Sequence, residues 1–193
     1  VAWTRAISLV LGSGTYALST MLSTFMAGLA IGSFIGGRIA DKRNNLIELF
    51  AFCEAGIGVF GILTIPLIYA LPPIYLYIYR AFHLNFTLFL GIQFLLCSMI
   101  MLIPTILMGM TFPLVSKAIT REMSEMGRKV GNAYSVNTLG AIIGAFSGGF
   151  LLLPTCGIKA AAFIAGGINL LVGVTLLFLF SGRGRRKIIP GLL

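Results

Sequence analysis

Residues 6–37 read AISLVLGSGTYALSTMLSTFMAGLAIGSFIGG and contain no charged side chain. A helix needs roughly 20 apolar residues to cross about 30 Å of hydrocarbon, so this stretch is long enough to span a membrane. Four more uncharged stretches follow it, at 55–79, 84–116, 130–158 and 160–182. The sequence therefore predicts an all-α fold, a polytopic transmembrane bundle of about five helices.

The composition supports a membrane protein, because 58% of the 193 residues are hydrophobic and only 10% are charged. A soluble domain of this length would need a larger polar surface, so membrane lipid is the expected surround. The net charge of +9 comes from Lys and Arg residues that lie beside the ends of the apolar stretches. Insertion rules and anionic headgroups account for such charges, and we expect no nucleic-acid partner.

The positive residues are distributed unequally between alternate connections. Eleven of them lie in three segments, 38–43, 117–129 and 183–187, and only Arg5, Arg80 and Lys159 lie in the others. Positive residues are enriched on the cytoplasmic side of a membrane, so we expect the first group there. The C-terminus would then be cytoplasmic, and the localisation we expect is a bacterial or archaeal inner membrane.

The expected boundaries follow from prolines, glycines and charges. Pro72 and Pro73 should end the second helix. The amphipathic stretch that follows, at 74–86, should lie in the membrane interface. Pro104 and Pro113 should kink or break the third helix. The expected helices are 13–37, 46–71, 86–115, 132–153 and 159–181. We expect one membrane domain at 1–182 and a basic cytoplasmic tail at 183–193. We also expect a sixth helix ahead of Val1, because the chain opens without Met or a signal peptide pattern.

Two of these helices carry glycine at every fourth position. Residues with this spacing share one helical face, and their missing side chains let a neighbouring backbone approach closely. Helix packing is the expected role, in preference to a substrate path, and Gly144→Leu should then disrupt the bundle. The residues are Gly28, Gly32, Gly36, Gly140, Gly144 and Gly148.

Residues 36–43 read GGRIADKR. This segment resembles the Gly-x-Leu-Ala-Asp-Arg signature that joins the second and third helices of major facilitator transporters. The resemblance implies that Arg38, Asp41 and Arg43 brace the cytoplasmic ends of helices. The alternative is that any short cytoplasmic connection would be basic.

A second resemblance covers nearly the whole chain. Its residues include Trp3-Thr4-Arg5, the run 28–33, Glu54, and the segment 131–140, GNAYSVNTLG. They resemble the membrane region of spermidine synthase-like membrane proteins. In that family a major-facilitator-like helical region, with one more helix ahead of the Trp-Thr-Arg segment, precedes a cytosolic aminopropyltransferase domain. The resemblance implies half of a major facilitator fold here.

The residues that would make this chain an enzyme are not found in it. A Rossmann-type domain needs a Gly-rich loop between a strand and a helix, and aminopropyl transfer needs paired acidic residues. The chain ends six residues after Lys187 without either feature. We therefore expect a noncatalytic chain without a cofactor, and the cysteines show no metal-ligand spacing.

Glu54 is the main candidate for a site within the membrane. It lies about two turns inside the second expected helix, where an unpaired carboxylate is costly. Glu54 would bind a cation or proton, or else donate or accept a hydrogen bond that locks two helices together. Asn137 and Thr138, in the fourth expected helix, are tentative substrate-binding residues with the same structural alternative.

Two functions from different classes remain open. The first is a transporter-like module that handles or senses a small cationic solute such as a polyamine. The second is a structural subunit that docks through glycine-rich helix faces onto a larger membrane complex. Six helices form half of a major facilitator pathway, so both hypotheses predict other membrane subunits or a homodimer as partners.

Overall fold

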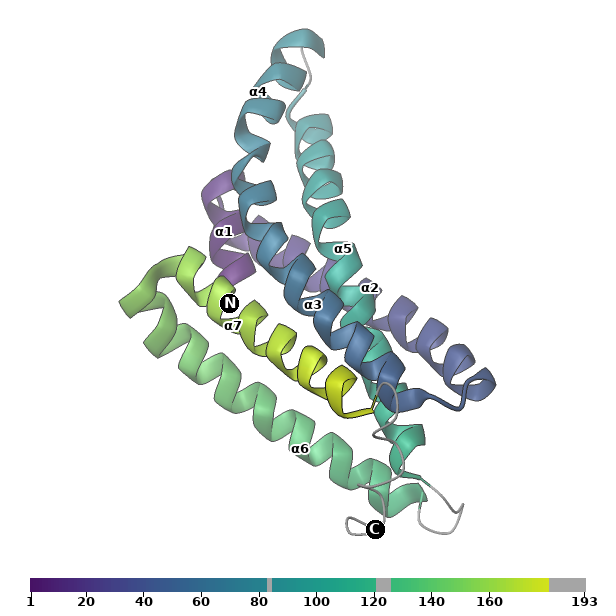
Figure 1. The fold of residues 1–193 in the computed structure, drawn as a ribbon. Helices are drawn as coiled ribbons and strands as arrows, with labels where there is room; N and C mark the ends of the chain where they lie inside the picture. The colour runs from purple at the N-terminus through teal and green to yellow at the C-terminus, as the bar shows by residue number, and fades with distance from the viewer. Residues whose placement is uncertain (83–84, 121–125, 181–193) are drawn as a thin grey trace.

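A computed structural model describes residues 1–82, 85–120 and 126–180 of the chain (Figure 1). These residues form helices joined by short connections, and no strand occurs among them. The expected basic tail at 183–193 and Arg121 lie outside the described residues. The elements are α1 (Ala2–Leu11), α2 (Gly14–Lys42), α3 (Leu46–Tyr69), α4 (Leu71–Phe82), α5 (Phe86–Ile119), α6 (Met126–Phe146), the π-helix η2 (Ser147–Leu152) and α7 (Leu153–Phe180).

Four helical stretches of the described chain are long and apolar enough to cross a membrane. They are Gly14–Lys42, Leu46–Tyr69, Phe86–Ile119 and Met126–Phe180. The last is 55 residues long and reverses direction at Gly157, whose φ of 77° and ψ of 174° are not helical. It therefore contains the fourth and fifth expected helices as two arms, α6 and α7. These helices are consistent with an integral membrane protein.

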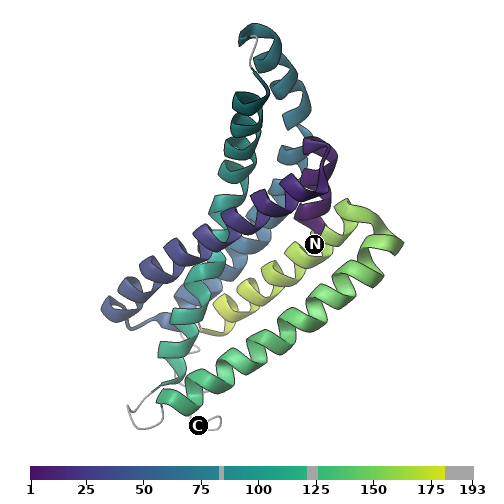
Figure 2. The ribbon, with the colours of Figure 1, turned by 180° about the vertical axis from the view of Figure 1, so that it is seen from behind.

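The helices pack in a row in which α3 contacts both α5 and α7, and α2 covers α5 (Figure 1). Seen from behind, α2 crosses in front of α5, while α6 runs along the outer side of α7 (Figure 2). The main contacts of α6 are with η2 and α5. The packed part of the bundle therefore consists of α1, α2, α3, α5 and α7.

A short helix, α1, precedes the first expected span and was not predicted. It ends at Gly12, which adopts a left-handed conformation with φ of 68°, a geometry that glycine adopts without steric cost. Ala6 and Ile7 of α1 are fully buried in a core that includes Ile65 and Ile68 of α3. The uncharged stretch at 6–37 is therefore divided between two helices rather than forming one.

The prolines agree with the expectation in part. Pro72 and Pro73 lie in the first turn of α4, where the missing N–H of proline has no helical partner to lose. Helix α3 ends at Tyr69, before the prolines. Helix α5 continues through Pro104 and Pro113, so the expected break does not occur, while the alternative, a kink at these residues, stays a prediction.

Helix α4 packs against the start of α5 (Figure 1). Tyr75 is buried, and its hydroxyl lies 3.2 Å from the thiol sulfur of Cys97. The ring of Phe89 in α5 meets Tyr75 edge to face. The segment expected to lie in the membrane interface is therefore a helix attached to α5 by aromatic contacts.

Candidate functional site

Glu54 lies in the middle of the row, on α3, and its side chain is half-buried. Among the residues that the structure describes, none forms a hydrogen bond or ion pair with it. Residues three and seven positions apart share a helical face, which places Glu54 in line with Ile57 and Gly61. Both of these residues line a cavity, so Glu54 lies one helical turn from its wall.

The cavity has a volume of about 430 Å³ and is bounded by α1, α2, α3, α5 and α7. Its lining is mainly apolar, with Trp3, Phe25 and Met108 on three different helices. The amide of Asn169, on α7, is one of the few polar groups in the wall. A cavity of this kind accepts an apolar chain along its wall and a polar group near Glu54 or Asn169.

Trp3 closes the cavity on the side of α1. Its indole Nε1 donates a hydrogen bond of 2.8 Å to the Thr64 hydroxyl. The Thr64 hydroxyl in turn donates to the carbonyl of Gly61, at 2.7 Å. These two bonds fix α1 on α3, and sequence analysis gave no role to Trp3 beyond its place in a family motif.

Asn137 and Thr138 are not brought to Glu54. Both are exposed on α6, and α7 lies between α6 and α3 (Figures 1 and 2). The Thr138 hydroxyl donates to the carbonyl of Tyr134 on its own helix, at 2.8 Å. The structure therefore places the three tentative substrate-binding residues in two separate regions.

The two glycine series lie in different surroundings. Gly28, Gly32 and Gly36 are buried where α2 crosses α5. A Cβ atom at Gly32 would overlap the Ile106 carbonyl, and one at Gly36 would lie 2.8 Å from the Met110 Cα atom. This close approach of the two backbones is supported by a bond of 3.1 Å from the Ser33 hydroxyl to the Gly109 carbonyl.

The glycines of α6 have no such neighbour. At Gly140, Gly144 and Gly148 an added Cβ would meet no described atom within 4 Å. No described residue of α6 is buried either. The expectation that Gly144→Leu disrupts the bundle of a single chain is therefore not supported by these contacts.

A third close approach, between α3 and α7, was missed by the sequence analysis. A Cβ at Gly58 would lie 2.6 Å from the Gly166 carbonyl, and one at Gly173 would lie 2.6 Å from the Ala55 nitrogen. Gly166 and Gly173 are seven positions apart and share a helical face. A search for glycines seven positions apart would have found Gly166 and Gly173, whereas a search for glycine at every fourth position did not.

The 36–43 segment lies on α2 rather than in a loop, because α2 continues to Lys42. Asp41 forms an ion pair of 2.6 Å with Lys117 near the end of α5, a partner that the sequence did not indicate. The Arg38 guanidinium lies 3.4 Å above the Phe34 ring. Arg38 and Arg43 form no ion pair with a described residue, so of the three motif residues Asp41 alone forms an ion pair with a described residue of another helix.

Asp41→Asn is expected to leave the midpoint of thermal unfolding almost unchanged, because exposed ion pairs contribute little to stability. Thermal unfolding in detergent measures this change. Lys117→Gln should have a similarly small effect, and the double variant should add nothing further. A large fall in the midpoint for either single variant would contradict a simple surface ion pair.

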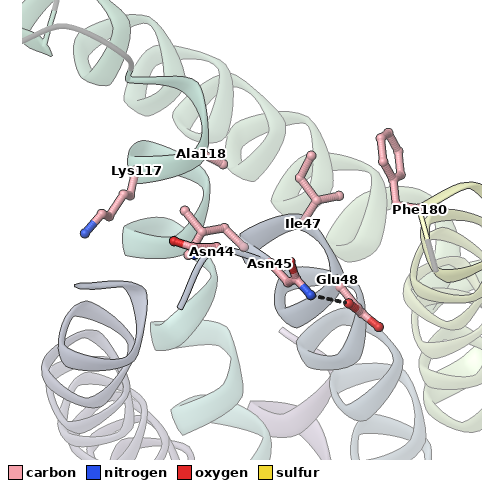
Figure 3. A pocket seen from close by; sticks show the side chains of 8 residues that line it. Asn44, Asn45, Ile47, Glu48, Lys117, Ala118 and Phe180 are labelled. Atoms are coloured by element: carbon pink, nitrogen blue, oxygen red, sulfur yellow. Dashed lines mark hydrogen bonds between the residues drawn. The ribbon is translucent and has the colours of Figure 1, made fainter. Parts of the chain in front are cut away.

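A hollow of about 250 Å³, with polar and apolar residues in its wall, lies near this ion pair at the start of α3 (Figure 3). It is lined by Asn44 and Asn45, which precede α3, and by residues of α3, the end of α5 and Phe180 of α7. Asn45 donates a hydrogen bond of 3.2 Å to Glu48, and the Lys117 ammonium points away from Glu48. Among the described residues no three His, Cys, Asp or Glu side chains are grouped to hold a metal.

The fold and the Glu54 region define a helical chain with apolar helices that can span a membrane, a half-buried acid and an apolar cavity. The chain is 24% identical over 197 aligned positions to a protein of Streptomyces coelicolor called Polyamine aminopropyltransferase 1. The match includes all of this chain, which spans about a third of that protein's length. No family model and no solved structure matches. The chain thus resembles a fragment of a spermidine synthase-like protein.

Proposed function

We propose that the chain is a noncatalytic membrane module that handles or senses a small cationic solute such as a polyamine. The observation that carries this proposal is Glu54, a carboxyl group without a described partner, one turn from the apolar cavity. Support also comes from the similarity of the whole chain to a protein named as a polyamine aminopropyltransferase. An ionisable residue inside a membrane span is a functional candidate by default.

The chemistry of a polyamine suits this arrangement. Its ammonium groups are separated by short methylene segments, so one end can pair with a carboxylate while a segment lies along an apolar wall. Glu54 would supply the charge, Asn169 an amide oxygen, and Trp3 an aromatic face, the kind of surface that attracts cations. Pairing with the solute would also remove the cost of an unpaired carboxylate among apolar helices.

In this proposal the module would lie in a bacterial or archaeal inner membrane, with its basic connections on the cytoplasmic side. It would form half of a major-facilitator-like fold, and a second half would come from a homodimer or another subunit. Catalysis would belong to a separate aminopropyltransferase domain or partner enzyme. The module needs no cofactor of its own.

Glu54→Gln is expected to weaken spermidine binding at least about tenfold, because the amide keeps the shape of the side chain but cannot carry a negative charge. Calorimetric titration of the purified protein in mild detergent measures the affinity. Glu48→Gln is the matched control, since it makes the same change on the same helix, two residues after its first residue. The control should change the affinity by less than about threefold.

A wild-type protein that binds no polyamine would contradict the proposed solute. Equal losses in the Glu54 and Glu48 variants would show that general negative charge, rather than the cavity region, attracts spermidine. Thermal unfolding of both variants in the same detergent checks that the bundle stays folded.

The alternative function is a structural subunit that docks onto a larger complex. The observation favouring it is the α6 helix, whose glycine face meets no described neighbour. In this reading Glu54 serves only to hold helices together, and Glu54→Gln should leave both stability and assembly unchanged. Gly144→Leu should then remove the partner proteins that co-purify in mild detergent.

A further inference from the structure

A separate hollow lies where α2 ends and α3 begins, and neither the Glu54 cavity nor the proposed function includes it. Its volume is about 580 Å³, within the usual range for small-molecule sites. Two candidate membrane spans, Gly14–Lys42 and Leu46–Tyr69, flank it directly. The hollow would therefore lie at the level where hydrocarbon gives way to lipid headgroups and water.

Two adjacent cations line this hollow. Lys42 is the last residue of α2 and Arg43 is its C-cap. Neither forms an ion pair with a residue in the part of the chain that the structure describes. The nearby Lys117 is different, because Asp41 already pairs with it at 2.6 Å. Lys42 and Arg43 thus present two positive charges to whatever occupies the hollow.

The opposite part of the wall is apolar. Ile39, Leu49 and Phe52 line it, and Phe52 is 58% exposed on the outer side of α3. These side chains lie on the membrane side of the two cations, since they are further inside their helices. A ligand in the hollow would therefore meet charge at one end and hydrocarbon at the other, as a phospholipid does.

Two further polar residues, Asn45 and Glu48, line the hollow. The Asn45 amide donates a hydrogen bond of 3.2 Å to the Glu48 carboxylate (Figure 3). The two cations remain the groups in this wall that attract an anion.

We propose that this hollow binds the headgroup of an anionic phospholipid, for which phosphatidylglycerol is the probe. The phosphodiester lies against Lys42 and Arg43. One acyl chain runs along Phe52 towards the bilayer interior. Basic pockets at the ends of membrane helices are known sites for anionic lipids.

The test is native mass spectrometry of the whole chain in mild detergent, titrated with phosphatidylglycerol, phosphatidylethanolamine or phosphatidylcholine. The wild type should retain phosphatidylglycerol at concentrations about tenfold lower than the two net-neutral lipids. The double variant Lys42→Gln/Arg43→Gln should weaken retention of phosphatidylglycerol by about tenfold or more. Phe52→Ala should weaken it by about fivefold, because the acyl chain loses an apolar contact.

Arg128→Gln/Lys129→Gln is the matched control, since it removes another adjacent pair of cations at the start of α6. It should change retention by less than about threefold. Equal losses in the two double variants, or equal retention of all three lipids, would overturn the proposal. Glycerol 3-phosphate is the soluble competitor; displacement of the lipid by it at equal concentration would assign the site to a free phosphate ester instead.

Discussion

Gly32→Leu should abolish stable packing of α2 on α5 and lower the free energy of unfolding by about 3 kcal/mol or more. The side chain would enter space occupied by the Ile106 carbonyl and the Gly109 backbone. Backbone atoms cannot move aside by changing a rotamer, so the whole interface must separate. The hydrogen bond from Ser33 to the Gly109 carbonyl would be lost in the same step.

A thiol-reactive dye can report this unfolding. Cys53 and Cys97 are buried and become reactive only when the helices separate, whereas the exposed Cys156 would first be replaced by Ser. The matched control is Gly144→Leu, the same change at a glycine without neighbouring atoms, which should shift stability by less than about 0.5 kcal/mol. Equal destabilisation at both positions would show that leucine in any of these glycine series is harmful.

A cysteine placed just before α3 and a cysteine placed on α7, beside the far end of α3, should label from opposite sides of the membrane, an all-or-none difference. Asn44→Cys lies just before α3, beside the basic end of α2. Lys159→Cys lies at the other end, where the Lys159 ammonium is 5.3 Å from the Tyr69 ring centre. Helix α3 has 24 residues and a length of about 36 Å, enough to cross the hydrocarbon between them.

The measurement uses an impermeant maleimide on intact cells that express a variant without its native cysteines. Lys159→Cys should react at once, and Asn44→Cys only after the membrane is opened, because positive residues favour the cytoplasmic side. Reaction of both from outside would contradict the expected topology. If Asn44→Cys reacted from outside and Lys159→Cys only after the membrane was opened, the spans would stand but their orientation would be the reverse of the one expected.

The spans were predictable because the uncharged stretches are long and their apolar character does not depend on neighbouring helices. The gap between the expected helices 132–153 and 159–181 also placed a reversal near Gly157, although the helical boundaries differ from expectation. In contrast, α1 was not predicted as a helix, although the first expected helix, at 13–37, begins close to the observed start of α2 at Gly14. The ten residues of α1 are too few to span a membrane, so the length of the uncharged stretch did not indicate a separate helix there.

Partners across helices were less predictable than the residues themselves. The spacing of Gly28, Gly32 and Gly36 indicated a face for close approach, but not that the face meets α5. Glycines with the same spacing on α6 have no described atom within 4 Å of an added Cβ. The spacing of glycines therefore does not indicate whether a neighbouring helix is present. Likewise, Asp41 was identified from a motif, whereas Lys117 was known only as one of many positive residues.

Helix α6 is attached to the rest of the protein at few points. It is attached through η2 at one end, and near its start the Tyr134 ring meets Phe112 of α5 at 6.2 Å. No described side chain along it is buried, so its middle is not held by the protein core. In a bilayer, acyl chains would contact the exposed side chains along α6 and supply the contacts that neighbouring helices supply elsewhere. The order of α6 would therefore follow the state of the lipid, and exchanging bilayer for detergent should alter this helix before any other.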